Sequence, residues 1–176
     1  EMTQWSAIVG GAGTEKGRAA RKLAALLEAR GLRVAGFVQN DVSDDAGETL
    51  GWDIASVTDP ERVGVLARIS QDPDLCGYKF EQAGFELARA LSDQPADVVV
   101  IGGVGKLEAA ERGHWPLLRG LIDRADSPHV VACIRDTCLS AIALALPDPL
   151  DYVELPCDDA ELERLAERLR AEIAAG

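Results

Sequence analysis

The segment most suited to chemistry is a glycine-rich loop, Gly10 to Gly17. It follows an apolar run that we expect to be a strand and precedes an amphipathic segment that we expect to be a helix. A phosphate-binding loop in this setting reads G-x-x-x-x-G-K-[ST]: its amides cradle phosphates, its lysine neutralises them and its hydroxyl holds Mg²⁺. Gly10 and Lys16 match this pattern. The sequence therefore predicts an anion-binding loop with Lys16 as its cation.

Two positions of this loop depart from the pattern. Glu15 replaces the second glycine and brings a negative charge to a point where backbone should approach phosphate, and Gly17 removes the hydroxyl ligand of Mg²⁺. The helix N-terminus and Lys16 still favour an anion, although a glycine-rich turn without a ligand is an alternative interpretation. The predicted binding residues of this loop are Gly10, Gly11, Ala12, Gly13, Thr14, Glu15, Lys16, Gly17 and Arg18.

A second glycine-rich loop, Gly102 to Glu108, follows the most β-branched run of the chain. A P-loop enzyme would carry acidic residues here to hold Mg²⁺, and Gly102 and Gly103 stand in their place. Mg²⁺ contributes several kcal/mol to phosphoryl transfer, so its loss would cost on the order of a thousandfold in rate. We therefore doubt an Mg²⁺ cofactor, and the sequence indicates no other. Glu108 either orients a water molecule, as a weak catalytic candidate, or begins the next helix.

The order of elements predicts a single α/β domain over residues 1–176, with a mostly parallel sheet and helices on both faces. Residues 97–101 are apolar from Val98 onward, which favours a central parallel strand. Residues 51–57 and 63–69 are expected to form a small antiparallel addition, after a polar turn at 40–48. Further strands are expected at 5–9, 33–38, 130–133 and 152–155, and helices at 17–30, 81–91, 117–124, 137–146 and after Asp158.

Ligands of such sheets bind outside the carboxyl ends of the strands. Besides Lys16 and Arg18, the basic residues Lys106 and Arg135 follow expected strands and are predicted to converge there, together with Gly102 and Gly103. Such a pocket would be positive within an acidic chain and would suit a bare oxyanion or a diphosphate. The alternative for each basic residue is a solvated surface charge.

Composition narrows the classes of partner. The net charge of −12 disfavours nucleic acid and anionic membranes as partners. No apolar run reaches the roughly 18 residues that span a bilayer, and no signal peptide is visible, so we expect a cytoplasmic location. The four cysteines are expected to be reduced thiols packed in the core rather than a metal or redox site. His114 and Trp115 are expected to anchor a helix at the surface, with stacking on a base as the alternative.

Matches in a fixed order along the chain carry a resemblance to a known family. These are residues 8–16, 33–38 (RVAGFV), 50–57 (LGWDIASV), 80–91, 104–108 (VGKLE) and 135–136. In them the chain resembles the thermophile-type, or cancer-related, nucleoside-triphosphatases. The resemblance implies a three-layer P-loop NTPase-like fold, with the first glycine loop as the P-loop and an arginine at position 135.

The departures at Glu15, Gly17, Gly102 and Gly103 resemble a divergent bacterial branch of that family. Residues 104–108, the pair at 70–71 (SQ) and Cys76 also fit this branch. Some of its members are encoded near molybdate-transport or nitrogen-fixation genes. The resemblance thus extends the ligands to be considered from nucleotides to molybdate-related oxyanions, and it puts hydrolysis in doubt.

Three functions remain open from the sequence. The leading hypothesis is a degenerate P-loop protein that binds a nucleotide or a small oxyanion with little or no hydrolysis. The second is a slow nucleoside-triphosphatase that forms NDP and phosphate, with Glu15 or Glu108 in place of the missing acids. The third is an adaptor that binds a protein partner and no small molecule. Loss of both Mg²⁺ anchors favours the first.

Overall fold

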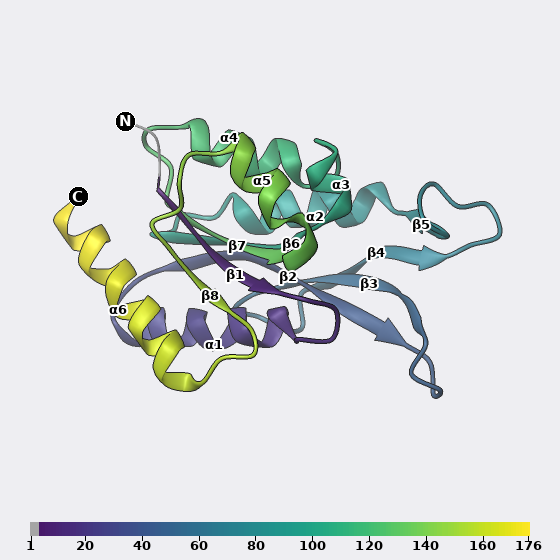
Figure 1. Ribbon diagram of the computed structural model, residues 1–176, viewed down its shortest axis with the longest axis horizontal. Coiled ribbons are helices and arrows are strands. Elements are labelled where there is room, and N and C mark those ends of the chain that lie inside the picture. The colour runs from purple at the N-terminus through teal and green to yellow at the C-terminus, as the bar shows by residue number, and fades with distance from the viewer. Residues whose placement is uncertain (1–3) are drawn as a thin grey trace.

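The computed structural model describes residues 4–176, and within this range the chain forms one eight-stranded sheet in the order β5-β4-β3-β2-β6-β7-β1-β8 (Figure 1). The strands are β1 Trp5–Gly10, β2 Val34–Ser43, β3 Thr49–Ser56, β4 Val63–Ile69, β5 Tyr78–Phe80, β6 Val98–Val104, β7 His129–Arg135 and β8 Asp151–Glu154. The helices are α1 Lys16–Ala29, α2 Gln82–Ser92, α3 Lys106–Ala109, α4 Trp115–Asp123, α5 Leu139–Ala145 and α6 Asp159–Ala175. A 3₁₀ turn, η1, spans Asp136–Cys138.

The two glycine loops lie at the same edge of the sheet. Strand β7 pairs in parallel with β1 on one side and with β6 on the other. Strands β1 and β6 therefore run in the same direction, and their carboxyl ends meet the same edge. Strand β6 lies between β2 and β7, which confirms the prediction of a central parallel strand.

Two helical layers cover the sheet, with α1 and α6 on one face and α2, α4 and α5 on the other (Figure 1). Alternate residues of β6 belong to different cores: Val98 and Val100 pack with α1 and α6, whereas Val99 and Ile101 pack with the opposite layer. All four side chains are fully buried. A strand covered on both faces needs apolar residues at every position, which is the pattern read from the sequence.

The antiparallel addition is larger than expected. Strand β2 continues to Ser43 and forms a hairpin with β3, so the predicted polar turn shortens to the residues around Gly47. The Asp44 side chain accepts hydrogen bonds from the amides of Ala46 and Glu48, both at 2.9 Å, and Gly47 takes a φ of 82°. Local hydrogen bonding of this kind closes a tight turn and leaves the flanking polar residues free to pair as strands.

Other local predictions were confirmed or need correction. The helix expected after Asp158 is α6, and the Asp158 side chain accepts from Glu161 N at 2.9 Å at its start. Strand β5 was not predicted, α3 was expected only as the helix that Glu108 begins, and η1 replaces the first turn of the helix expected at 137–146. Their three or four residues are too short to show a periodic pattern.

The cysteine prediction holds for two residues and is wrong for one. Cys133 and Cys138 are buried and Cys157 is partly buried, whereas Cys76 is exposed. Cys76 lies in the loop between β4 and β5 and has a φ of 51°. Within residues 4–176, no helix combines the length and apolarity needed to cross a bilayer.

Candidate functional site

The loop between β1 and α1 has left-handed backbone at the position where the phosphate-loop pattern places its second glycine. Glu15 adopts the left-handed conformation, with φ 57° and ψ 50°, and Gly13 has a φ of 77°. Left-handed backbone is unfavourable for residues other than glycine, and glycine is the residue that the phosphate-loop pattern places at position 15. The Thr14 hydroxyl donates to the Gly11 carbonyl at 2.6 Å and closes the loop.

The Glu15 side chain is turned toward solvent. Its carboxylate lies 3.6 Å from the Arg18 guanidinium, and about two thirds of the side chain (68%) is exposed. The position thus keeps a glycine-like backbone while its charge is held beside a cation one helical turn away. An exposed pair of this kind contributes little to stability.

Lys16 is folded over the loop. Its Nζ donates to the carbonyl oxygens of Gly10 and Gly11, both at 3.1 Å. Burial is the main cause that lowers the pKa of Lys16, and the nearby charge of Arg135 lowers it further. An anion placed between Lys16 and Arg135 would offset both effects.

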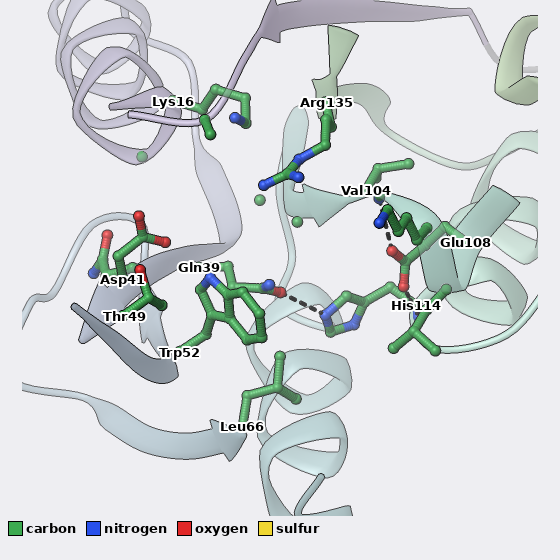
Figure 2. A pocket seen from close by; sticks show the side chains of 18 of the residues that line it. Lys16, Gln39, Asp41, Thr49, Trp52, Leu66, Val104, Glu108, His114 and Arg135 are labelled. Carbon is green, nitrogen blue, oxygen red and sulfur yellow. Dashed lines mark hydrogen bonds between the residues drawn. The ribbon is translucent and has the colours of Figure 1, made fainter. Parts of the chain in front are cut away.

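Arg135 supplies the second cation from the end of β7, where it pairs in register with Gly10 of β1. It is half-buried, and its guanidinium forms neither a hydrogen bond nor an ion pair with any residue from 4 to 176. Figure 2 shows the side chain extending into the pocket from the same side as Lys16. A partly buried guanidinium with five unused donors is suited to bind an oxyanion.

These residues border a cavity of about 680 Å³. Its far side is aromatic: the rings of Trp52 and Tyr78 have centroids 4.4 Å apart, and those of Phe80 and Phe85 are 6.1 Å apart. The predicted residues that line the cavity are Ala12, Gly13, Glu15, Lys16, Gly17, Arg18, Gly102, Gly103, Lys106, Glu108 and Arg135. Gly10, Gly11 and Thr14 belong to the loop but do not line the cavity.

Glu108 is held by the chain's own backbone. Its two carboxylate oxygens accept hydrogen bonds from Gly105 N and His114 N, each at 2.8 Å. The residue is buried, and burial raises the pKa of its carboxyl group. Because both oxygens are engaged, Glu108 caps the first turn of α3, which begins at Lys106, and this geometry fits a helix start better than a role in orienting water.

His114 and Gln39 form a polar contact at the floor of the cavity that the sequence did not suggest. His114 Nε2 and Gln39 Oε1 are 3.2 Å apart (Figure 2). The imidazole packs against the rings of Phe37 and Phe85. Burial lowers the pKa of His114 to about 4, so the ring is neutral, and the tautomer that carries its proton on Nε2 donates to the amide oxygen. The surface-anchor prediction is wrong, since both His114 and Trp115 are buried.

The residues missed from the sequence come from the antiparallel addition. Gln39, Asn40 and Asp41 lie on β2, Trp52 on β3 and Tyr78 on β5, and all line the cavity. The one available signal was the change from apolar residues to the polar residues 39–41 where β2 leaves the sheet core. Within residues 4–176, no three His, Cys, Asp or Glu side chains gather where they could hold a metal ion.

The sheet order, the glycine loop between β1 and α1 and the cations at the carboxyl edge define a P-loop NTPase-like α/β protein. Two solved structures share the fold. The solution structure of a human cancer-related nucleoside triphosphatase matches with a TM-score of 0.65 and 18% identity, over 99% of each chain. The crystal structure of THEP1 from the hyperthermophile Aquifex aeolicus matches with a TM-score of 0.70 and 19% identity, over 94% of this chain and 98% of that one.

The chain belongs to the family described as a protein of unknown function, DUF2478, whose profile matches residues 6–143. This range includes both glycine loops, the antiparallel addition and Arg135. No curated protein matches the chain. At identities below 20% the structural likeness establishes the fold, so function must be argued from the site.

Proposed function

We propose that this protein binds a nucleotide at the carboxyl edge of its sheet and hydrolyses it little or not at all. The observation that carries the proposal is the pair of cations Lys16 and Arg135 at one end of a cavity whose other end is aromatic. Phosphates would lie against the cations and the helix N-terminus, and the base would lie against Trp52. Phosphate at such a helix end is a recurrent arrangement.

The size and composition of the cavity favour a nucleotide over a bare oxyanion such as molybdate. A volume of about 680 Å³ lies in the range of pockets for organic ligands. An oxyanion would fill the end between Lys16 and Arg135 and leave Trp52 and Tyr78 without a function. Aromatic rings offer a planar base a stacking surface. Molybdate and related oxyanions remain the second candidate because the same two cations would bind them.

Slow turnover follows from what the site offers to a water molecule. The Glu108 carboxylate is engaged by two amides, and Glu15 is turned toward Arg18. Gly17, Gly102 and Gly103 supply no oxygen ligands for Mg²⁺. Phosphoryl transfer depends on the metal and on a positioned nucleophile, so binding without efficient hydrolysis is the function that this geometry supports best.

A thermal-shift panel tests the proposal. The ligands are ADP, ATP, GDP and GTP, compared with pyrophosphate, phosphate, sulfate, molybdate and tungstate. A ligand at 100 times its Kd should raise the free energy of unfolding by about 2.7 kcal/mol. Lys16→Ala and Arg135→Ala should each abolish the shift. Lys22→Ala removes a matched charge from an exposed pair with Asp159 outside the cavity and should leave it intact.

Three results would overturn the proposal. Phosphate release from ATP or GTP at about one per second, an ordinary enzymatic rate, lost in Lys16→Ala, would identify the slow-enzyme alternative as correct. A flat response to the whole panel in the wild type would favour an adaptor that binds a protein partner. A response to molybdate or tungstate without any to nucleotides would select the oxyanion.

A further inference from the structure

Two neighbouring amide side chains of β2, Gln39 and Asn40, occupy the space that Mg²⁺-binding side chains would need. A Cβ added at Gly17, the position of the P-loop hydroxyl, would lie 2.8 Å from Asn40 Oδ1. A Cβ added at Gly103, one of the positions expected to be acidic, would lie 2.1 Å from Gln39 Oε1. In this chain, each of these two glycines is therefore sterically matched to one amide side chain: Gly17 to Asn40, and Gly103 to Gln39. Each glycine leaves the room that an amide occupies.

The backbone of β2 closes the remaining position. A Cβ at Gly102 would lie 2.3 Å from the Phe37 carbonyl oxygen and 2.5 Å from Val38 Cα. Real Cβ atoms do not come this close to backbone, so no side chain fits at 102 unless a strand moves. The residues present thus do not fit Mg²⁺ in the way that P-loop enzymes hold it.

Both amides are placed to meet a ligand. The neutral His114 ring holds Gln39 Oε1 at 3.2 Å, which leaves the Gln39 NH₂ group as a donor. Neither this NH₂ group nor the Asn40 side chain forms a hydrogen bond with any residue from 4 to 176. Both residues line the cavity beside Lys16. An amide NH₂ carries two donors and suits an anionic oxygen.

We infer that the cavity takes its phosphate-bearing ligand as the free anion rather than as the Mg²⁺ chelate, and that Gln39 and Asn40 select this form. The inference rests on the proposed function. A chelated Mg²⁺ would bring a cation toward Lys16, Arg135 and the NH₂ donors, and like charges at close range are costly where water is scarce. The free anion meets donors and positive charge on the same side.

Asp41 is the residue that would bind Mg²⁺ if the cavity took the chelate instead. It lines the cavity and its charge acts on Lys16. Its carboxylate forms no hydrogen bond with any residue from 4 to 176. One carboxylate and the ligand's phosphates can hold Mg²⁺, so Asp41→Asn is part of the test.

The test is calorimetric titration of ADP into the full chain, once in EDTA and once in excess Mg²⁺. The wild type should bind ADP more tightly in EDTA than in Mg²⁺, and equal or weaker binding in EDTA would overturn the selection of the free anion. Gln39→Glu keeps the shape of the side chain but adds a carboxylate. It should weaken binding in EDTA by about tenfold or more, given the strength of charge interactions near 4 Å, and Mg²⁺ should then restore it. Gln94→Glu adds the same charge at an exposed position and should change neither titration.

The outcomes separate the two proposals. Binding of ADP in Mg²⁺ but not in EDTA would overturn the inference and leave the proposed function standing, and its loss in Asp41→Asn would identify Asp41 as the cation's ligand. No binding of ADP in either buffer would contradict the proposed function for this nucleotide. Equal behaviour of Gln39→Glu and Gln94→Glu would overturn the assignment of Gln39. If Gln39→Glu does not fold by circular dichroism, Asn40→Asp takes its place with the same expectations.

Discussion

Gly103 and Gln39 compete for one space: a Cβ at position 103 would lie 2.1 Å from Gln39 Oε1 and 2.6 Å from its Cδ. Gly102, one residue earlier, meets backbone atoms of β2 instead. A side chain can swing away at a modest cost, whereas a strand paired on both sides cannot. Two adjacent glycines on β6 therefore have different physical reasons to be glycine.

This difference predicts unequal costs for two alanine substitutions. Gly103→Ala should lower the free energy of unfolding by about 1 kcal/mol, because Gln39 must give up its hydrogen bond with His114. Gly102→Ala should lower it by about 3 kcal/mol, at the upper end for overpacking, because the new methyl group meets backbone. Urea unfolding measures both. Adding Gln39→Ala should relieve most of the cost of Gly103→Ala, leaving only the Cβ of residue 39 at 3.0 Å, and none of the cost of Gly102→Ala. Equal costs, or rescue of both, would contradict the assigned contacts.

Two substitutions at Glu15 distinguish the effect of its carboxylate charge from the strain of its left-handed backbone. Glu15→Ala and Glu15→Gly both remove the carboxylate, but only glycine relieves the conformation at φ 57°. Glu15→Gly should therefore be up to about 1 kcal/mol more stable than Glu15→Ala. Both should bind pyrophosphate a few-fold more tightly than the wild type, since an exposed like charge is lost. Weaker binding in both variants would mean that Glu15 itself contacts the ligand, through a bridging cation.

Trp52 distinguishes a nucleotide from an inorganic anion. Trp52→Leu keeps an apolar side chain beside Tyr78 but removes the larger ring, so it should weaken ADP binding by about 1 kcal/mol, or roughly fivefold. The affinity of Trp52→Leu for pyrophosphate should equal that of the wild type. Calorimetry measures both, and indole fluorescence reports the ADP complex, because Trp5 and Trp115 are buried away from the cavity. If both ligands lose affinity equally, the ring supports the fold and does not contact a base.

Two buried histidines predict how stability depends on pH. Burial lowers the pKa of His114 and His129 from 6.5 to about 4. Between these values the unfolded chain binds more protons than the folded chain, so the free energy of unfolding falls as pH drops from about 6.5 to about 4. Each histidine accounts for on the order of 3 kcal/mol over this window. The raised pKa of Glu108 acts in the opposite direction and offsets part of the loss.

Urea unfolding at several pH values checks this expectation. His129 Nε2 and Ser6 Oγ share a hydrogen bond of 2.9 Å, and His129→Gln keeps a hydrogen-bonding group at this position. This variant should reduce the slope of stability against pH by about one proton. A wild-type curve that is flat over the window would show that the imidazoles are not desolvated.

The sequence by itself determined the architecture and the location of the two glycine loops. The unbroken apolar run of β6 required cover on both faces, and glycines at the ends of β1 and β6 placed two loops at one edge of the sheet. Lys16 followed from its place at the end of the first glycine loop, and Arg135 from its place just beyond the strand expected at 130–133. These conclusions needed only periodicity and local turn chemistry, which act between residues close in the chain.

Tertiary structure alone decided what surrounds those cations. Gln39 reaches Gly103 and His114 because β2 lies beside β6, and Trp52 meets Tyr78 because the hairpin carries β3 toward β5. Glu108 could begin a helix or orient water until its two oxygens were seen to bind backbone amides. Each of these contacts depends on which strands are neighbours and on angstrom-scale distances between them. Neither property is encoded in the spacing of residues along the chain.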